Sequence, residues 1–192
     1  MADVGHHSES ESSLEPLRGD NIVLIGMRGS GKSTVAELLR VQTKKRIIDT
    51  DKMVEEKAGM PISEIVKTMG EKHFRELEDE AVQHASRQTN VIIATGGGAV
   101  TRPENIHALR QNSFVVWLKA DIPVLEARTK GDSNRFPLND AATLGGQMER
   151  TAHERKDNYE KTKDIAIDTT SISQDRVAKE IYHAIEQRRK KA

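Results

Sequence analysis

Short runs of apolar residues alternate along this chain with longer stretches in which apolar residues recur every three or four positions. The short runs predict β-strands at 22–25, 46–48, 91–95, 114–118 and 165–168. The longer stretches predict helices at 32–42, 52–58, 62–69, 71–87, 103–111, 122–129, 147–160 and 174–189. Strands separated by helices in this way favour an α/β fold with a parallel sheet. Because parallel sheets bind ligands at the carboxyl ends of their strands, the residues after each apolar run are the candidates for function.

The stretch after the first apolar run, 26–34, matches the pattern Gly-x-x-x-x-Gly-Lys-Ser of a phosphate-binding loop. The apolar run before it and the helical pattern after it supply the strand–loop–helix context that this motif requires. Glycines let the loop turn its N–H groups inward, and the start of the helix adds partial positive charge. In such a loop Lys32 reaches the β- and γ-phosphates, and the hydroxyl of Ser33 ligates Mg²⁺. The agreement of motif and context argues against the alternative, an ordinary glycine-rich turn.

The composition excludes several classes of function. The chain has 192 residues, enough for one domain with a substantial core, which we expect to span 21–192. Its 30 basic and 30 acidic residues give zero net charge, which argues against a general nucleic-acid binder. Because there is no cysteine, disulfides, thiolate metal sites and cysteine nucleophiles are excluded. The mean hydropathy is −0.64 and no apolar run is long enough to span a membrane, so no membrane association is expected.

Residues 1–20 are rich in serine and glutamate and show no periodicity, which predicts a disordered tail. The tail contains one arginine, Arg18, and no apolar segment. It therefore resembles neither a secretory signal peptide nor an arginine-rich transit peptide, and a cytoplasmic protein is the default expectation.

Two carboxylates, Asp49 and Asp51, follow the second predicted strand. Residues at i and i+2 of an extended chain project to the same side, so this pair can serve one site. Asp49 is a candidate to hold Mg²⁺, directly or through water, and Asp51 is a candidate to accept a hydrogen bond from a substrate hydroxyl. The alternative is that one of the two only caps a helix that begins at Lys52.

Arg75 lies in the first turns of the helix predicted at 71–87, and Glu78, three residues later, is close enough to pair with it. A guanidinium fixed in this way can bind a ligand carboxylate through two hydrogen bonds. The spacing alone favours the other interpretation, an exposed ion pair of little energetic value.

Three glycines, Gly96, Gly97 and Gly98, come directly after the third predicted strand. They expose backbone N–H groups and leave room for a ligand to approach closely. The alternative is a flexible turn, which is less favoured because three consecutive glycines destabilise any structure.

The polar, glycine-containing stretch from about 129 to 146 predicts a mobile lid. Arg135 within it is a candidate to close over the phosphates and stabilise charge in the transition state, although an exposed connecting loop fits equally well. Beyond it, Arg155 and Tyr159 share one face of a helix, which makes Arg155 a candidate second cation for a ligand. Residues 168–171 follow the last strand and are placed to flank an adenine.

Taken together, these residues resemble the shikimate kinase family over roughly 21–189. The resemblance rests on Gly-Met-Arg-Gly-Ser-Gly-Lys-Ser-Thr at 26–34, Asp-Thr-Asp at 49–51, Gly-Glu-x-x-Phe-Arg-x-x-Glu at 70–78, Ala-Thr-Gly-Gly-Gly-Ala-Val at 94–100 and Arg-x-x-x-Tyr at 155–159. It implies a five-stranded parallel sheet with helices on both faces, the three-layer sandwich of nucleoside monophosphate kinases with a mobile lid. Two departures stand out: the family's lid reads Arg-Pro-Leu-Leu where this chain has Arg-Phe-Pro-Leu at 135–138, and the proline usual between arginine and tyrosine is absent at 155–159.

The resemblance implies an enzyme that transfers the γ-phosphoryl group of ATP to the 3-hydroxyl of shikimate, with Mg²⁺ as cofactor. With Thr169 added from 168–171, the expected nucleotide-binding residues are Gly29, Ser30, Gly31, Lys32, Ser33, Thr34, Arg128, Arg135 and Thr169. The expected substrate-binding residues are Asp51, Arg75, Gly96, Gly97, Gly98 and Arg155. Ser33 and Asp49 are expected to hold the metal, and Lys32, Asp51 and Arg135 are the expected catalytic residues.

Two other functions stay open. A gluconate kinase-like enzyme would also act on an anionic polyol, but the Phe-Arg-x-x-Glu and triple-glycine motifs argue against it. A non-catalytic shikimate-binding regulator would be expected to lack Lys32, Asp51 or the lid arginine, and all three are present. The expected partners are the small molecules ATP and shikimate, and a monomer is the expected state.

Overall fold

The computed structural model describes residues 21–130 and 143–191. The predicted tail at 1–20, most of the predicted lid and Arg135 therefore lie outside the described residues. Five parallel strands form one sheet in the order β2-β3-β1-β4-β5. They are β1 (Asn21–Ile25), β2 (Arg46–Asp49), β3 (Val91–Ala94), β4 (Ser113–Lys119) and β5 (Ile165–Asp168). All five predicted strands are present to within one residue at each end, and the predicted α/β fold with a parallel sheet is confirmed.

The helices follow the predicted pattern, with differences at their ends. They are α1 (Lys32–Thr43), α2 (Thr50–Ala58), α3 (Ile62–Ser86), α4 (Pro103–Arg110), α5 (Ile122–Thr129), α6 (Leu144–Thr162) and α7 (Gln174–Lys191), with a short 3₁₀ turn η1 (Ala99–Thr101). Helix α2 begins two residues earlier than predicted and α6 three residues earlier. The two helices predicted at 62–69 and 71–87 are the two parts of α3, which is broken at Gly70 by a non-helical backbone (φ 85°, ψ 161°).

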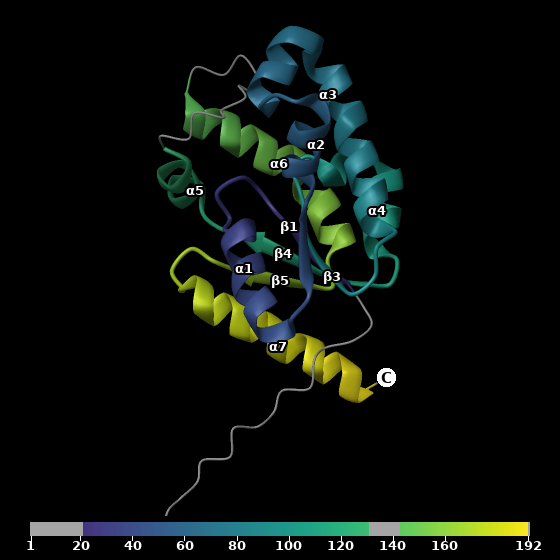
Figure 1. The fold of residues 1–192 in the computed structure, drawn as a ribbon. Helices are drawn as coiled ribbons and strands as arrows, with labels where there is room; N and C mark the ends of the chain where they lie inside the picture. Colours follow the sequence, from purple (N-terminus) through teal and green to yellow (C-terminus); the bar gives the residue numbers. More distant parts are fainter. Residues whose placement is uncertain (1–20, 131–142, 192) are drawn as a thin grey trace, which may run out of the picture.

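The sheet is the middle layer of three, because alternate side chains of its strands point to opposite faces. In β1, Ile22 and Leu24 pack with residues of α1 and α7, whereas Val23 and Ile25 pack with residues of α3, α4, α5 and α6. Figure 1 shows α1 and α7 together on one side of the sheet and α3, α4 and α6 on the other. Nearly continuous apolar runs such as that of β1 are typical of strands that are buried on both faces.

This topology brings four segments with predicted site residues to one edge of the sheet, since the carboxyl ends of parallel strands all lie there. The phosphate-loop motif, the three glycines and Thr169 follow β1, β3 and β5, respectively, and the two aspartates lie at the junction of β2 and α2. Within 21–130 and 143–191, no helix has the length and apolar character that a bilayer crossing requires.

Candidate active site

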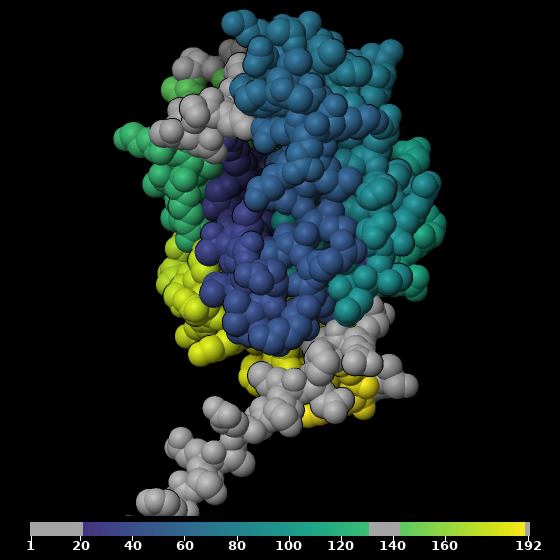
Figure 2. Space-filling view, viewed as in Figure 1, coloured from purple at the N-terminus to yellow at the C-terminus, as the bar shows by residue number. Residues whose placement is uncertain are grey.

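A pocket of about 990 Å³ opens at this edge of the sheet. In Figure 2 the purple segment that carries the phosphate loop lies at the bottom of a hollow, between green α5 and the blue helices α2 and α3. Of the residues predicted for function, the pocket is lined by Gly29, Gly31, Lys32, Ser33, Thr34, Asp49, Asp51, Arg75, Gly97, Gly98, Arg128 and Arg155. Ser30, Gly96 and Thr169 are buried and do not line it.

The phosphate loop has the backbone that its glycines were expected to permit. Gly26, Gly29 and Gly31 have φ values of 144°, 82° and 96°, which residues with a side chain rarely adopt. The ammonium of Lys32 folds back over the loop and donates hydrogen bonds to the carbonyls of Gly26 (2.9 Å) and Met27 (3.0 Å). Burial lowers the pKa of Lys32 to about 8, although the nearby carboxylates of Asp51 and Asp49 oppose this shift. A polyphosphate in the loop would supply the negative charge that stabilises this ammonium.

Asp49 has two roles in the geometry of the site. Its Oδ1 accepts hydrogen bonds from the backbone N–H groups of Asp51 (3.0 Å) and Lys52 (3.3 Å), so it caps α2 as the alternative interpretation held. Its Oδ2 accepts a 3.4 Å hydrogen bond from the hydroxyl of Ser33. Capping of α2 and the contact with Ser33 are therefore compatible in one side chain, because each uses a different oxygen.

The oxygens of Ser33 and Asp49 are hard donors of the kind that Mg²⁺ prefers. In the part of the chain that the structure describes, no three His, Asp or Glu side chains cluster as a metal site. This pattern fits a magnesium ion that one carboxylate and one hydroxyl hold together with phosphate oxygens and water, rather than a cage made by protein alone.

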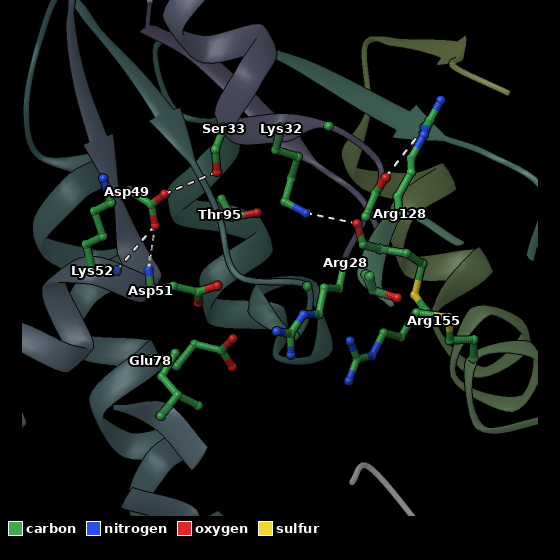
Figure 3. Close-up of a pocket in the computed structure, with 18 of the residues that line it drawn as sticks. Arg28, Lys32, Ser33, Asp49, Asp51, Lys52, Glu78, Thr95, Arg128 and Arg155 are labelled. Carbon is green, nitrogen blue, oxygen red and sulfur yellow. Dashed lines mark hydrogen bonds between the residues drawn. The ribbon is translucent and has the colours of Figure 1, made fainter. Parts of the chain in front are cut away.

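The extended geometry expected for Asp51 is wrong. Helix α2 begins at Thr50 rather than Lys52, so Asp51 lies in its first turn and not on extended chain. Its carboxylate still faces the pocket, close to Lys32 (Figure 3). The pKa of Asp51 is raised to about 6, mainly by burial and also by the carboxylates of Asp49 and Glu78, while Lys32 opposes the shift. Asp51 is thus a more basic carboxylate than an exposed aspartate.

Arg75 pairs with Glu78 as the spacing predicted, but this pair is not the exposed one of the alternative interpretation. Arg75 Nη1 donates to Glu78 Oε2 (2.7 Å), and Nη2 donates to the exposed Glu71 (3.1 Å). Only 2% of Glu78 and 16% of the Arg75 side chain are exposed. A buried, hydrogen-bonded pair has a fixed orientation, which an exposed pair lacks, so the Arg75 guanidinium is held ready to bind a carboxylate in the pocket.

The three glycines make room for side chains of the pocket as well as for a ligand. A Cβ on Gly96 would overlap Asp51 Oδ1 and lie 2.8 Å from Glu78 Oε1. A Cβ on Gly98 would overlap Arg75 Nη1. At Gly97 the nearest atom, Arg155 Nη1, would be 3.4 Å away, an ordinary contact. Gly96 and Gly98 therefore permit the observed positions of the acidic and cationic groups.

Arg155 comes from α6 and lines the pocket, and Tyr159, one turn later, fixes this helix to the glycine loop. The Tyr159 hydroxyl donates a 2.7 Å hydrogen bond to the carbonyl of Gly97. The Tyr159 ring stacks on Trp117 with centroids 5.4 Å apart. Burial raises the pKa of Tyr159 to about 12, against the opposing effect of Arg155, so the hydroxyl stays a donor. Arg155 and Tyr159 therefore share one helix face as predicted: Arg155 lines the pocket, and Tyr159 binds the glycine loop.

Thr169 holds Arg128 at the other end of the pocket. Arg128 donates to the hydroxyl (3.1 Å) and carbonyl (2.7 Å) of Thr169, which is fully buried. Thr169 in turn donates to the carbonyl of Ser30 (3.3 Å). Arg128 lines the pocket with a guanidinium in a fixed plane, whereas Thr169 and Ser30 support it from behind.

The sequence interpretation missed three charged residues that line the pocket: Lys52, Glu55 and, in the phosphate loop itself, Arg28. It occupies one of the variable positions of the phosphate-loop motif and lines the pocket near Arg155 (Figure 3). The motif leaves these positions free, so the only available signal was an arginine in a loop that binds anions.

One wall of this pocket is a loop built for a polyphosphate, and the facing wall presents oriented carboxylates and guanidinium groups. Two small molecules held between these walls are placed for phosphoryl transfer from one to the other. On this parallel sheet, the arrangement defines a phosphate-loop kinase of small molecules.

Comparison with known proteins narrows this class. Residues 28–186 match the family model of shikimate kinase, and the chain belongs to that family. It is 37% identical over 161 residues to a shikimate kinase of Legionella pneumophila, covering 84% of this chain and 91% of that one. For a shikimate kinase of Symbiobacterium thermophilum, the identity is 38% over 169 residues, with 88% and 97% covered. A solved structure, shikimate kinase from Acinetobacter baumannii in complex with shikimate, matches with a TM-score of 0.83 at 29% identity, covering 88% of this chain and 94% of that one.

Proposed function

We propose that this protein transfers the γ-phosphoryl group of ATP to the 3-hydroxyl of shikimate, giving shikimate 3-phosphate and ADP. The observation that carries the proposal is the acceptor half of the pocket. There, Asp51, Arg75 and Arg155 face the phosphate loop across one cavity. Shikimate offers a carboxylate for two guanidinium groups and ring hydroxyls for a carboxylate, so its chemistry complements these side chains.

The donor half consists of the phosphate loop and the plane of Arg128. The N–H groups of 29–34 and the Lys32 ammonium bind the phosphates, and the Arg128 guanidinium stacks on the adenine. Ser33 and Asp49 would hold Mg²⁺, which supplies charge neutralisation at the phosphates when it is bound. Arg135, outside the described residues, stays a prediction as the lid arginine, as do Lys32 and Asp51 as catalytic groups.

The acceptor half orients the nucleophile. Arg75 and Arg155 fix the shikimate carboxylate, and Asp51 accepts the proton of the 3-hydroxyl as its oxygen attacks the γ-phosphorus. The backbone of 96–98 lines the ring. Because phosphoryl transfer needs little covalent chemistry from the protein, positioning and charge neutralisation supply most of the rate.

A coupled assay of ADP formation with ATP, Mg²⁺ and shikimate tests the proposal, with gluconate and other hydroxy acids as alternative acceptors. Of these acceptors, we expect only shikimate to support ADP formation. Faster turnover with gluconate would favour a gluconate kinase-like enzyme, and shikimate binding without ADP formation would favour a regulator. No turnover with any acceptor from well-folded protein would refute the proposal.

The Asp51→Asn variant tests the role of the carboxylate. It should lose turnover because the amide cannot accept the proton, while ATP binding measured by calorimetry persists. Near-normal turnover would show that Asp51 has been assigned the wrong role. The monomeric state and the cytoplasmic location stay predictions from the sequence.

A further inference from the structure

Arg28 stands where the donor and acceptor halves of the pocket meet. It is the third residue of the phosphate loop, and its side chain lines the pocket. Its backbone nitrogen would be 3.7 Å from a Cβ on Gly97, and Arg155 Nη1 would be 3.4 Å from the same point. In the view of Figure 3 the Arg28 guanidinium lies between the carboxylate of Glu78 and the guanidinium of Arg155. One residue of the nucleotide-binding loop thus points its charge towards the acceptor.

Three positive side chains converge on this junction. Arg28, Lys32 and Arg155 all line the one pocket, and Arg28 and Arg155 both lie beside Gly97. Arg75 also lines this pocket, and its guanidinium donates hydrogen bonds to Glu78 and Glu71. Like charges brought together in a pocket repel one another, and an anion placed among them removes this repulsion.

Binding of the acceptor carboxylate does not by itself explain why Arg28 joins Arg155 and Lys32 in the pocket. Arg75 and Arg155 already supply two guanidinium groups for one carboxylate, and Lys32 and the loop N–H groups serve the bound phosphates. Arg28 is left between them, at the place where the phosphoryl group must pass from donor to acceptor. In transit that group carries its charge on three equatorial oxygens, which suit the planar, forked donors of an arginine.

We propose that Arg28 is a catalytic residue that contacts the equatorial oxygens of the phosphoryl group in transit. This role rests on the proposed function. In the step it assists, the bond from the γ-phosphorus to the β,γ-bridging oxygen breaks, and its electron pair stays on ADP. The bond from the acceptor oxygen to the γ-phosphorus forms, and the hydroxyl proton goes to Asp51. Arg28 exchanges no proton and provides hydrogen bonds that strengthen as charge develops on the oxygens.

The test replaces Arg28 and separates kcat from KM. Arg28→Met keeps length and packing but removes the charge, so kcat should fall at least ~100-fold, the loss typical of one transition-state donor. The KM values for ATP and shikimate should stay near those of the wild type, because the contact forms only in the transition state. Arg28→Lys should recover only part of the loss, since an ammonium lacks the planar fork.

Two further measurements exclude a structural explanation. In Arg28→Ala, added guanidinium ion should restore part of kcat, which a folding defect would not allow. ADP with aluminium fluoride and shikimate, a mimic of the phosphoryl group in transit, should bind the wild type tightly and Arg28→Met weakly, while ADP alone binds both equally. Arg176→Met is the matched control, because Arg176 is 69% exposed on α7 and pairs with a helix neighbour, Glu180. Its kcat should equal that of the wild type.

A kcat of Arg28→Met close to the wild-type value would overturn the proposal. So would a large rise in the KM for shikimate at unchanged kcat, which would make Arg28 a ligand of the acceptor carboxylate instead. The proposed function is judged separately by the wild-type rate on shikimate. If that rate is absent, the rates at which Arg28→Met and the wild type slowly hydrolyse ATP are compared instead. Hydrolysis transfers the same γ-phosphoryl group, with water as the acceptor.

Discussion

At the scale of single residues, the charge of Asp51 controls both stability and chemistry. Its carboxylate shares a partly buried space with Asp49, Glu78 and Lys32, and its pKa is raised to about 6. Because folding raises this pKa above the ordinary value of 3.8, the protonated form stabilises the native state. That stabilisation is complete below about pH 4 and is lost as the pH rises through 6.

Asp51→Asn removes this titration at nearly constant shape. Both proteins are measured without metal. As the pH rises from 4 to 7.5, the unfolding free energy of the variant should increase relative to that of the wild type by up to about 3 kcal/mol. Urea unfolding of both proteins at several pH values measures the difference. A difference in unfolding free energy that stays constant with pH would contradict the raised pKa.

The glycine loop allows a matched comparison of single methyl groups. Gly96→Ala would push Asp51 and Glu78 out of place, whereas Gly97→Ala makes only an ordinary contact with Arg155. Because a displaced catalytic carboxylate slows the chemical step, we expect kcat to fall ~100-fold in Gly96→Ala and by less than ~3-fold in Gly97→Ala. Steady-state kinetics with both alanine variants checks this, and equal losses would show that the loop tolerates no side chain for another reason.

At the scale of elements, the break in α3 at Gly70 separates the helix segment 62–69 from the segment that carries Arg75. Gly70 has φ 85° and ψ 161°, a combination that is essentially restricted to glycine, although a Cβ there would meet no atom within 4 Å. Gly59, at the end of α2, is equally open but has ordinary left-handed values of 69° and 15°. The two glycines differ mainly in backbone strain.

Gly70→Ala should therefore destabilise the protein more than Gly59→Ala does. We expect a loss of about 2–3 kcal/mol at Gly70, against about 1 kcal/mol at Gly59. Gly70→Ala should also raise the KM for shikimate, because the helix segment that orients Arg75 begins at this break. Thermal unfolding and steady-state kinetics measure the two effects, and equal stability losses would show that the break relaxes without strain.

Element boundaries also mark the limit of what the sequence predicts. The break at Gly70 was predictable because glycine interrupts a helical pattern. The start of α2 was not, because either aspartate in Asp-Thr-Asp is a good helix cap. In the structure Asp49 is the cap: it accepts from the N–H groups of Asp51 and Lys52 and from the hydroxyl of Ser33, which is distant in sequence. The buried nature of the Arg75–Glu78 pair was equally hidden, because burial depends on α3 packing beside the glycine loop.

At the scale of the whole molecule, the sequence predicted the five parallel strands and the edge at which they bind ligands, but not their order. Apolar runs such as 22–25 and 91–95 show which segments are buried, and they contain no information on which neighbour each one pairs with. The sequence could predict that the site residues lie at one edge, because most of them directly follow a predicted strand. Arg28 was missed because its function depends on Gly97 and Arg155, which are distant in sequence.

The two halves of the pocket should respond differently to removal of metal. Chelation by EDTA should abolish turnover, because Ser33 and Asp49 can hold a magnesium ion only at the donor half. Shikimate binding, measured by calorimetry without nucleotide, should be unchanged, because Arg75 and Arg155 need no metal. Loss of shikimate affinity in EDTA, restored by Mg²⁺ but not by ATP, would place a metal in the acceptor half instead.

The stack of Trp117 on Tyr159 gives the molecule a built-in optical probe. The chain has one tryptophan, so all indole fluorescence comes from this position. Its neighbour Tyr159 holds the glycine loop, one helical turn from Arg155. Shikimate should therefore change the emission of Trp117, whereas ADP alone should change it less, and Tyr159→Phe should weaken the response by cutting the link to Gly97. Acceptor binding can then be followed in unlabelled protein, in real time, from the light of a single side chain.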